Sequence, residues 1–167
     1  MNQFNNGVAL DGSSIEGIET PFSYGMACYP EKHEEAPNMD SDIHYLKEKI
    51  KNGASYLVTQ MFFDNDKYYA FVDRCRKEGI QVPIIPGIKP IVFKNQLTVL
   101  PRIFRSDIPE PFAVELRKCK SDEEAKEVGV EWCITQCKDL MAHGVPSLHF
   151  YTMMASESVR RVAKEIY

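Results

Sequence analysis

The chain switches repeatedly between short apolar runs and stretches with helical periodicity, and Gly or Pro stands at each switch. The first two apolar runs, residues 24–29 and 55–63, begin about thirty residues apart, which suits one strand–helix–strand crossover. Two further runs follow at 82–88 and 147–152. This alternation predicts an α/β protein whose parallel strands are joined by right-handed crossovers.

Helices are predicted between these runs. The first begins near Ser41, the second is capped by Asp64 or Asn65, and the last covers the residues after 152. Ser121 and Glu124 form a capping box for a long helix. The segment 95–119 should be helical only in pieces, because prolines interrupt it at Pro101, Pro109 and Pro111. Glycines are expected to end three of the helices, at Gly53, Gly79 and Gly144.

The chain length limits which parallel fold can be complete. A closed (β/α)₈ barrel, the TIM barrel, needs eight strand–helix units and about 250 residues. This chain of 167 residues supplies about four units, which is half of such a barrel. We therefore expect one half-barrel domain over residues 21–167, preceded by a polar segment over 1–20 for which disorder is an open alternative.

The composition excludes several classes of protein. The net charge is -4 and the basic residues are interspersed with acids, so a nucleic-acid-binding surface is not expected. We expect neither secretion nor membrane insertion, because residues 1–14 are polar and no apolar run approaches the roughly 20 residues of a membrane span. The five cysteines are an odd number without C-x-x-C spacing, which favours buried, reduced thiols in a cytoplasmic protein.

Polar side chains gather after the first strand, where parallel α/β proteins bind their ligands. Tyr29 and His33 follow the strand, and Asp42 and Lys49 lie on the next helix. A ring, a carboxylate and cations together could hold the base, ribose and phosphates of a nucleotide. The alternative is that Asp42 is a favourable charge at a helix N-terminus and that Lys49 lies on a solvated helix face.

Other polar residues also have two interpretations. Gln60 interrupts an apolar strand, so its amide is either a hydrogen-bonded structural group or a reader of a heterocycle at the barrel mouth. His149 is either structural or catalytic. Cys133, Cys137 and His143 lie on one helix and give no tetrahedral arrangement, so we expect no metal site.

The residues at these strand ends resemble methylenetetrahydrofolate reductase, and the order and spacing of the motifs agree with that family over residues 22–167. The motifs are A-C-Y-P-E-K-H-x-E-A (27–36), D-I-H-Y-L-K-E-K (42–49), N-G-A-x-x-L-V-T-Q-M-F-F-D (52–64), P-I-I-P-G-I-K-P (83–90) and H-F-Y-T (149–152). The resemblance places the chain at strands five to eight of the family's TIM barrel.

The resemblance implies a flavin-dependent oxidoreductase of one-carbon and methionine metabolism. Such an enzyme reduces 5,10-methylenetetrahydrofolate to 5-methyltetrahydrofolate with FAD as cofactor and NAD(P)H as hydride donor. The positions that match FAD contacts of the family are Tyr29, His33, Ala36, Asp42 and Lys49. Those that match folate contacts are Gln60 and Gln96.

The chain departs from the family's pattern in two ways. The final strand is followed by Met153, Met154 and Ala155 instead of the Asn-Arg pair that helps to hold the folate tail. The family's catalytic glutamate and its Arg-Gly-Asp turn belong to the first half of the barrel, so no complete catalytic set is expected here. We therefore interpret the chain as the C-terminal half of such a reductase, deficient alone. The alternatives are a non-catalytic half-barrel that forms homo-oligomers, and a half that is completed by a separate N-terminal chain.

Overall fold

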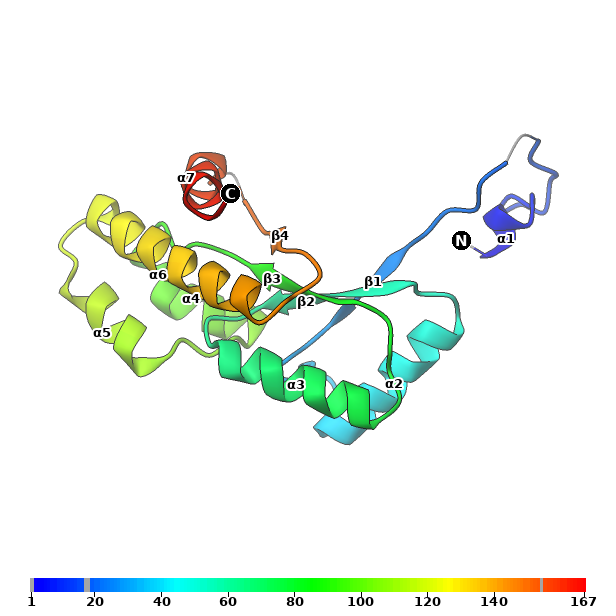
Figure 1. Ribbon diagram of the computed structural model, residues 1–167, viewed down its shortest axis with the longest axis horizontal. Coiled ribbons are helices and arrows are strands. Elements are labelled where there is room, and N and C mark those ends of the chain that lie inside the picture. Colours follow the sequence, from blue (N-terminus) through cyan, green and yellow to red (C-terminus); the bar gives the residue numbers. More distant parts are fainter. Residues whose placement is uncertain (1, 17–18, 154) are drawn as a thin grey trace.

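A computed structural model describes residues 2–16, 19–153 and 155–167, and shows a four-stranded parallel sheet (Figure 1). The strands lie side by side in chain order. They are β1 (Gly25–Cys28), β2 (Tyr56–Met61), β3 (Ile84–Ile88) and β4 (His149–Phe150). The parallel α/β fold expected from the alternating pattern is thus confirmed.

Helices lie between the strands and after the last one, as expected, and a short unexpected helix precedes the first strand. They are α1 (Asn2–Asn5), α2 (Met39–Lys51), α3 (Asn65–Lys77), α4 (Gln96–Phe104), α5 (Glu110–Lys118), α6 (Asp122–Ala142) and α7 (Ser156–Ile166). Asp64 caps α3, and Ser121 caps α6 by accepting a hydrogen bond from the Glu124 amide. The glycines predicted to end helices all have positive φ angles. Within the described residues, no helix is both long and apolar enough to cross a membrane.

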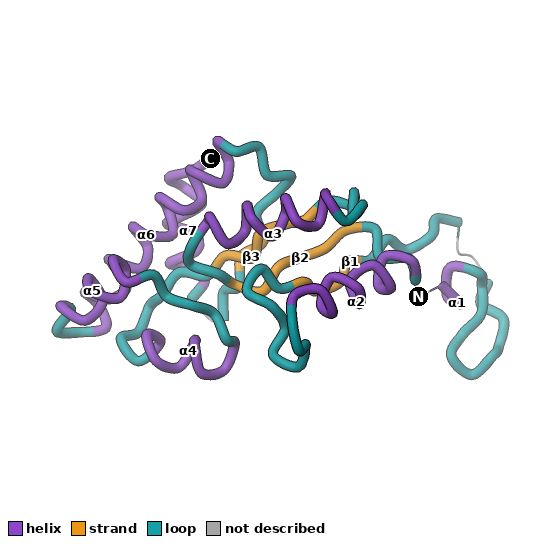
Figure 2. The backbone as a smooth tube through the Cα atoms, turned by 90° about the horizontal axis from the view of Figure 1, so that it is seen from below, coloured by secondary structure: helices purple, strands orange, loops and turns teal. Residues whose placement is uncertain are grey.

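The helices cover one face of the sheet and leave the other open. Figure 2 shows α2 and α3 in front of the strands, and one apolar cluster joins strand side chains such as Leu57 and Ile84 to α2, α3, α6 and α7. On the opposite face, Ala27, Val58 and Ile85 stand next to one another in register. Ala27 is exposed and the other two are only partly buried. The sheet therefore has an apolar face that the described part of the chain does not cover.

Three local predictions are corrected by the structure. The last strand is only His149–Phe150 rather than 147–152, because it pairs solely with the end of β3. Pro101 lies inside α4 instead of interrupting it, since burial of Leu100 holds this short helix in spite of the lost backbone donor. The carboxylate of Glu124 accepts from the Lys120 amide rather than from Ser121, so the capping box is incomplete.

The N-terminal segment stands away from the sheet in both views (Figures 1 and 2). It contains α1 and an antiparallel bridge between Val8 and Ser14. The side chain of Asn5 exchanges two hydrogen bonds with the backbone of Phe22, which ties α1 to the start of the half-barrel segment. Residues 1, 17 and 18 of the segment predicted over 1–20 lie outside the described residues.

Candidate functional site

The loop between β1 and α2 brings all five predicted cofactor residues to one cavity of about 470 Å³. The five are Tyr29, His33, Ala36, Asp42 and Lys49. Glu35 and Tyr45 complete the lining and were not singled out from the sequence, although both lie inside the segment that carries the motifs. The cavity lies at the carboxyl end of β1, where parallel α/β proteins bind ligands.

Hydrogen bonds within the chain fix the course of this loop. One oxygen of the Asp42 carboxylate accepts from the His33 amide at 2.8 Å. Lys32, whose φ is 76°, donates from its Nζ to the carbonyl oxygens of His33 and Ala36. The Asn38 side chain caps α2 by accepting from the Ser41 amide. Asp42 is thus more than a favourable helix charge, because it also holds the loop that lines the cavity.

Lys49 is partly exposed, but it also makes contacts with the first strand and the loop after it. It lies in the last turn of α2 and reaches back to β1, where its Nζ donates to the carbonyl oxygen of Ala27 at 2.8 Å. The same ammonium lies 5.8 Å from the centre of the Tyr29 ring. That ring meets the His33 imidazole edge-on at 4.5 Å. Burial raises the pKa of Tyr29, so the phenol stays neutral at pH 7.

The groups in this cavity fit part of a dinucleotide. The Glu35 amide donates to Nδ1 of His33, so the imidazole proton is on Nε2 and remains available to an acceptor. Together with the Lys49 ammonium, this donor suits phosphate oxygens. The carboxylate of Asp42 can accept from ribose hydroxyls, and a cavity of about 470 Å³ is within the usual range for small-molecule sites. The residues therefore fit FAD.

Gln60 lies at the carboxyl end of β2 and is half-buried. Its Oε1 accepts from the Met61 amide at 2.9 Å, so the oxygen of the side-chain amide is already hydrogen-bonded to the neighbouring residue. Gln60 borders a small cavity that is also lined by Tyr29, and Tyr29 lines the larger cavity as well. Tyr29 thus connects the predicted folate contact with the predicted cofactor contacts.

Gln96, the other predicted folate contact, has a structural role in the turn after β3. It is the first residue of α4, and its Oε1 accepts from the amides of Val92 and Phe93 at 2.8 and 3.2 Å. The structure does not place it in the cavity that Gln60 borders. Its contact with substrate stays a prediction.

Glu31 is a residue of interest that the sequence interpretation did not single out. It lies beside Gln60 in the same small cavity, and both carboxylate oxygens face the Asp107 amide at 3.2 Å. Burial raises the pKa of Glu31 to about 7, and the nearby Asp107 carboxylate adds to the effect while the amide opposes it. Its position directly after Tyr29 and Pro30 was the available signal.

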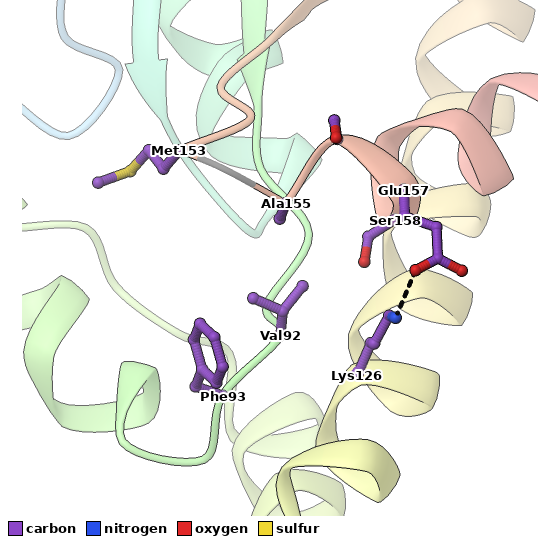
Figure 3. Close-up of a pocket in the computed structure, with 8 residues that line it drawn as sticks. Val92, Phe93, Lys126, Met153, Ala155, Glu157 and Ser158 are labelled. Carbon is purple, nitrogen blue, oxygen red and sulfur yellow. Dashed lines mark hydrogen bonds and ion pairs between the residues drawn. The ribbon is translucent and has the colours of Figure 1, made fainter.

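At the β4 side, a third cavity of about 260 Å³ lies between the turn after β3 and the start of α7 (Figure 3). Figure 3 shows Lys126 reaching from α6 to Glu157 on α7, and their charged groups are 3.2 Å apart. Ala155, in the region where the family has its Asn-Arg pair, is the N-cap residue of α7 and provides no side-chain hydrogen bond. Because of its ion pair with Glu157, Lys126 already has a charge partner within the chain.

Cys133, Cys137, His143 and His149 do not line the cofactor cavity or the small cavity beside Gln60. Cys133 and Cys137 are buried, whereas His143 is exposed and contacts Tyr69 and Asp139. Among the described residues, no group of three or more His, Cys, Asp or Glu side chains is placed to hold a metal ion. His149 is exposed and packs edge-on against the ring of Tyr151.

Comparisons with known proteins agree with the motifs. Residues 13–167 match the family model described as methylenetetrahydrofolate reductase. The chain is 38% identical over 147 residues to a probable methylenetetrahydrofolate reductase (NADPH) of Caenorhabditis elegans, covering 87% of this chain and 22% of the relative. It is 36% identical over 137 residues to the 5,10-methylenetetrahydrofolate reductase of Salmonella typhimurium, covering 81% and 46%. The chain thus spans less than half the length of these relatives.

A solved structure supports the fold. It is an uncharacterized protein from Clostridium thermocellum whose description states that it binds two copies of 5-methyl-5,6,7,8-tetrahydrofolic acid. It superposes with a TM-score of 0.62 at 20% identity, over 87% of this chain and 54% of that protein. At this identity the likeness concerns the fold alone.

Proposed function

The chain belongs to the methylenetetrahydrofolate reductase family, an oxidoreductase family, and on this premise we propose that it supplies the flavin- and folate-binding half of a reductase barrel. Its four strands would be strands five to eight of a (β/α)₈ barrel. The complete enzyme would reduce 5,10-methylenetetrahydrofolate to 5-methyltetrahydrofolate with NAD(P)H, in one-carbon and methionine metabolism. The buried, unpaired thiols suit a cytoplasmic location.

The observation that carries the proposal is the convergence of Tyr29, His33, Ala36, Asp42 and Lys49 on one cavity. Lys49 and His33 would hold the diphosphate of FAD, and Asp42 would bind a ribose hydroxyl. When bound, FAD would supply the hydride-transfer chemistry between nicotinamide and folate. The chain itself would bind and orient the cofactor, since its loop is already fixed by hydrogen bonds.

Gln60 would contact the folate pterin beside the cofactor. Its Nε2 group remains free to donate after Oε1 has bonded to the Met61 amide, and the shared Tyr29 places it next to the FAD cavity. The folate bound by the Clostridium thermocellum protein supports a folate ligand for this fold. Gln96 would be a second contact. The folate tail would lack an arginine partner, because Met153, Met154 and Ala155 stand in place of the family's Asn-Arg pair. Lys126, the cation nearby, is paired with Glu157.

A specific observation favours a second candidate, a non-catalytic half-barrel that self-associates. The sheet face with Ala27, Val58 and Ile85 is apolar and uncovered by the described chain. Either a second copy or a separate N-terminal half could cover it. The polar cavity after β1 distinguishes the two proposals, because a structural half-barrel has no need of it.

Size-exclusion chromatography with light scattering and absorbance at the flavin band tests both proposals on the chain mixed with FAD. The proposed function predicts flavin that co-elutes with the protein at a fixed ratio, whatever the oligomeric state. A colourless dimer would contradict flavin binding and support the structural candidate. A reductase assay of the flavin-bound sample, with NADH and NADPH in turn, then measures whether this half has any activity alone.

A further inference from the structure

A separate cavity of about 390 Å³ lies on the helical side of the sheet, between α3 and α6. Its walls include Phe63 at the end of β2, Pro109 before α5 and Trp132 on α6. None of its lining residues belongs to the proposed cofactor cavity. The site has no part in the function proposed above, so it requires its own explanation.

Each side-chain donor group in this lining that the structure describes makes at least one hydrogen bond within the protein. The Trp132 indole N–H donates to the carbonyl oxygen of Phe63 at 3.1 Å. The Gln136 amide donates to the carbonyl of Phe62 at 3.0 Å. The hydroxyl of Thr135 donates to the carbonyl of Glu131 at 3.1 Å. An incoming ligand would therefore find few free donors in the wall.

The Asn65 side chain also uses its donors within the protein, whereas its oxygen has no partner among the described residues. Its Nδ2 donates to the Gln136 carbonyl at 3.0 Å and to the Asp139 carboxylate at 2.7 Å. Its Oδ1 is buried and has no hydrogen-bond partner in the described part of the chain. Gln136 is only 5% exposed, and no described group donates to its side-chain oxygen. Buried acceptors of this kind normally have a partner.

The charge of the lining also favours a ligand that donates hydrogen bonds and carries positive charge. Asp64 and Asp139 contribute carboxylates, and none of the described lining residues is a lysine or arginine. Hydrogen bonds from Tyr69 and Asn65 lower the pKa of Asp139, so it is ionised at pH 7. The apolar wall is firmly built, because the Trp132 ring stacks on Phe112 at 4.5 Å. The cavity thus combines negative charge, an unused acceptor on Gln136 and aromatic surface.

We propose that this cavity binds a small organic cation, namely a primary ammonium or guanidinium group on a short apolar stem. The cationic head would donate to the side-chain oxygen of Gln136 and approach the two carboxylates, while the stem would pack on Phe63, Pro109 and Trp132. A bare metal ion would leave the aromatic wall unused. The proposal is independent of flavin and folate binding.

Trp132 is the only tryptophan of the chain, so its fluorescence reports directly on this cavity. The flavin-free protein is titrated near pH 7 with butylammonium and butylguanidinium, and in parallel with 1-butanol and butyrate. We expect a saturable change with the two cations and none with the neutral or anionic probe. A response to butanol as strong as that to butylammonium, or no saturable change with either cation into the millimolar range, would overturn the proposal.

Matched variants locate the binding site. Asp64→Asn retains the cap of α3, because Asn and Asp are equivalent N-caps, and removes one charge from the lining. Both Asp64→Asn and Asp139→Asn should weaken butylammonium binding about fivefold or more. Glu131→Gln makes the same charge change on α6 outside the lining and should leave the affinity unchanged. Equal weakening by Glu131→Gln would reduce the effect to long-range charge and contradict the site.

Circular dichroism checks that each variant is folded. If Asp139→Asn unfolds because Tyr69 and Asn65 lose their acceptor, Asp64→Asn still decides the matter. Unchanged affinity in a folded Asp64→Asn variant would then contradict the proposed role of the carboxylates.

Discussion

At the β1 side of the sheet, the loop after the strand is held by its own hydrogen bonds, with Asp42 on the His33 amide and Lys49 on the Ala27 carbonyl. At the β4 side, the strand has two residues, and α7 begins at Ser156 with Ala155 as an N-cap that provides no side-chain hydrogen bond. The two regions lie on opposite edges of one sheet. The β1 side can position a ligand because hydrogen bonds within the chain hold its loop. The β4 side has only a two-residue strand and a helix start without a side-chain cap.

Two lysines show the same contrast. The Lys49 ammonium has the Ala27 carbonyl and the Tyr29 ring as neighbours. Lys89, directly after β3, is 2% exposed, and its Nζ has no hydrogen-bond partner among the described residues. The Lys49 ammonium thus has partners within the chain, and the Lys89 ammonium has none among the described residues. The cofactor is assigned to the β1 side because its five candidate residues meet in one cavity there.

The largest expected effect concerns packing beside β3. A Cβ at Gly129 on α6 would overlap the backbone carbonyl of Ile91, whereas one at Gly25 in β1 would meet only the Tyr56 ring. We expect Gly129→Ala to lower the free energy of unfolding by about 2–3 kcal/mol, since backbone cannot move aside easily. Gly25→Ala should cost less than about 1 kcal/mol, because the ring can turn. Urea denaturation of both variants measures this, and equal costs would contradict the contrast.

The second effect has the opposite sign. Lys89→Met replaces a buried, unpartnered ammonium by an apolar side chain of similar length, and should raise the free energy of unfolding by about 1–2 kcal/mol at pH 7. Burial lowers the pKa of Lys89 in the folded state. The unfolded chain therefore binds the proton more tightly, so wild-type stability should rise with pH and the gain from Lys89→Met should shrink. Destabilisation by Lys89→Met would show that the ammonium has a partner.

The third prediction compares how FAD affinity changes when a lysine is replaced at the β1 edge and at the β4 edge of the sheet. Lys49→Met should weaken FAD binding about tenfold, equivalent to about 1.4 kcal/mol, because the cation that we propose to face the diphosphate is lost. Lys126→Met removes a cation at the β4 side, where Glu157 already neutralises it, and should leave the affinity unchanged. Quenching of flavin fluorescence measures both. If Lys126→Met gave the larger loss, the cofactor would belong to the other edge.

The smallest effect is a pH dependence at Glu31. Its folded-state pKa of about 7 exceeds the ordinary value of 4.5, so the folded state binds the proton more tightly than the unfolded state. Stability from this group is fully present below pH 4.5 and is lost as pH rises through 7. Glu31→Gln should remove this loss, about 1 kcal/mol after solvent screening. Denaturation at pH 5 and pH 8 tests it, and Glu34→Gln, at an exposed loop carboxylate whose pKa is lowered by Arg105, should not reproduce it.

Much of the fold could be predicted because its signals are local. The caps at Asp64 and Ser121, and the helix-ending glycines, depend on backbone geometry within a few residues. The length of β4 and the continuity of α4 through Pro101 could not be predicted, because they depend on pairing and burial against distant segments. Tertiary contacts outweighed local propensity at both places.

The site shows the same division. The five proposed cofactor residues were predicted as a set from the family resemblance, and the structure brings that set to one cavity. The interaction between Glu31 and Asp107 joins residues 76 positions apart, and no spacing rule indicates it. Gln96 had a plausible match by motif, but only the folded turn shows that its oxygen already accepts from Val92 and Phe93.

Hydrogen–deuterium exchange of the chain with and without FAD tests the assignment of the cofactor most directly. The account predicts that FAD slows amide exchange over residues 29–49, in the β1–α2 loop and α2, and leaves residues 155–158 at the start of α7 unchanged. Protection confined to residues 155–158, or no protection anywhere at saturating FAD, would contradict it.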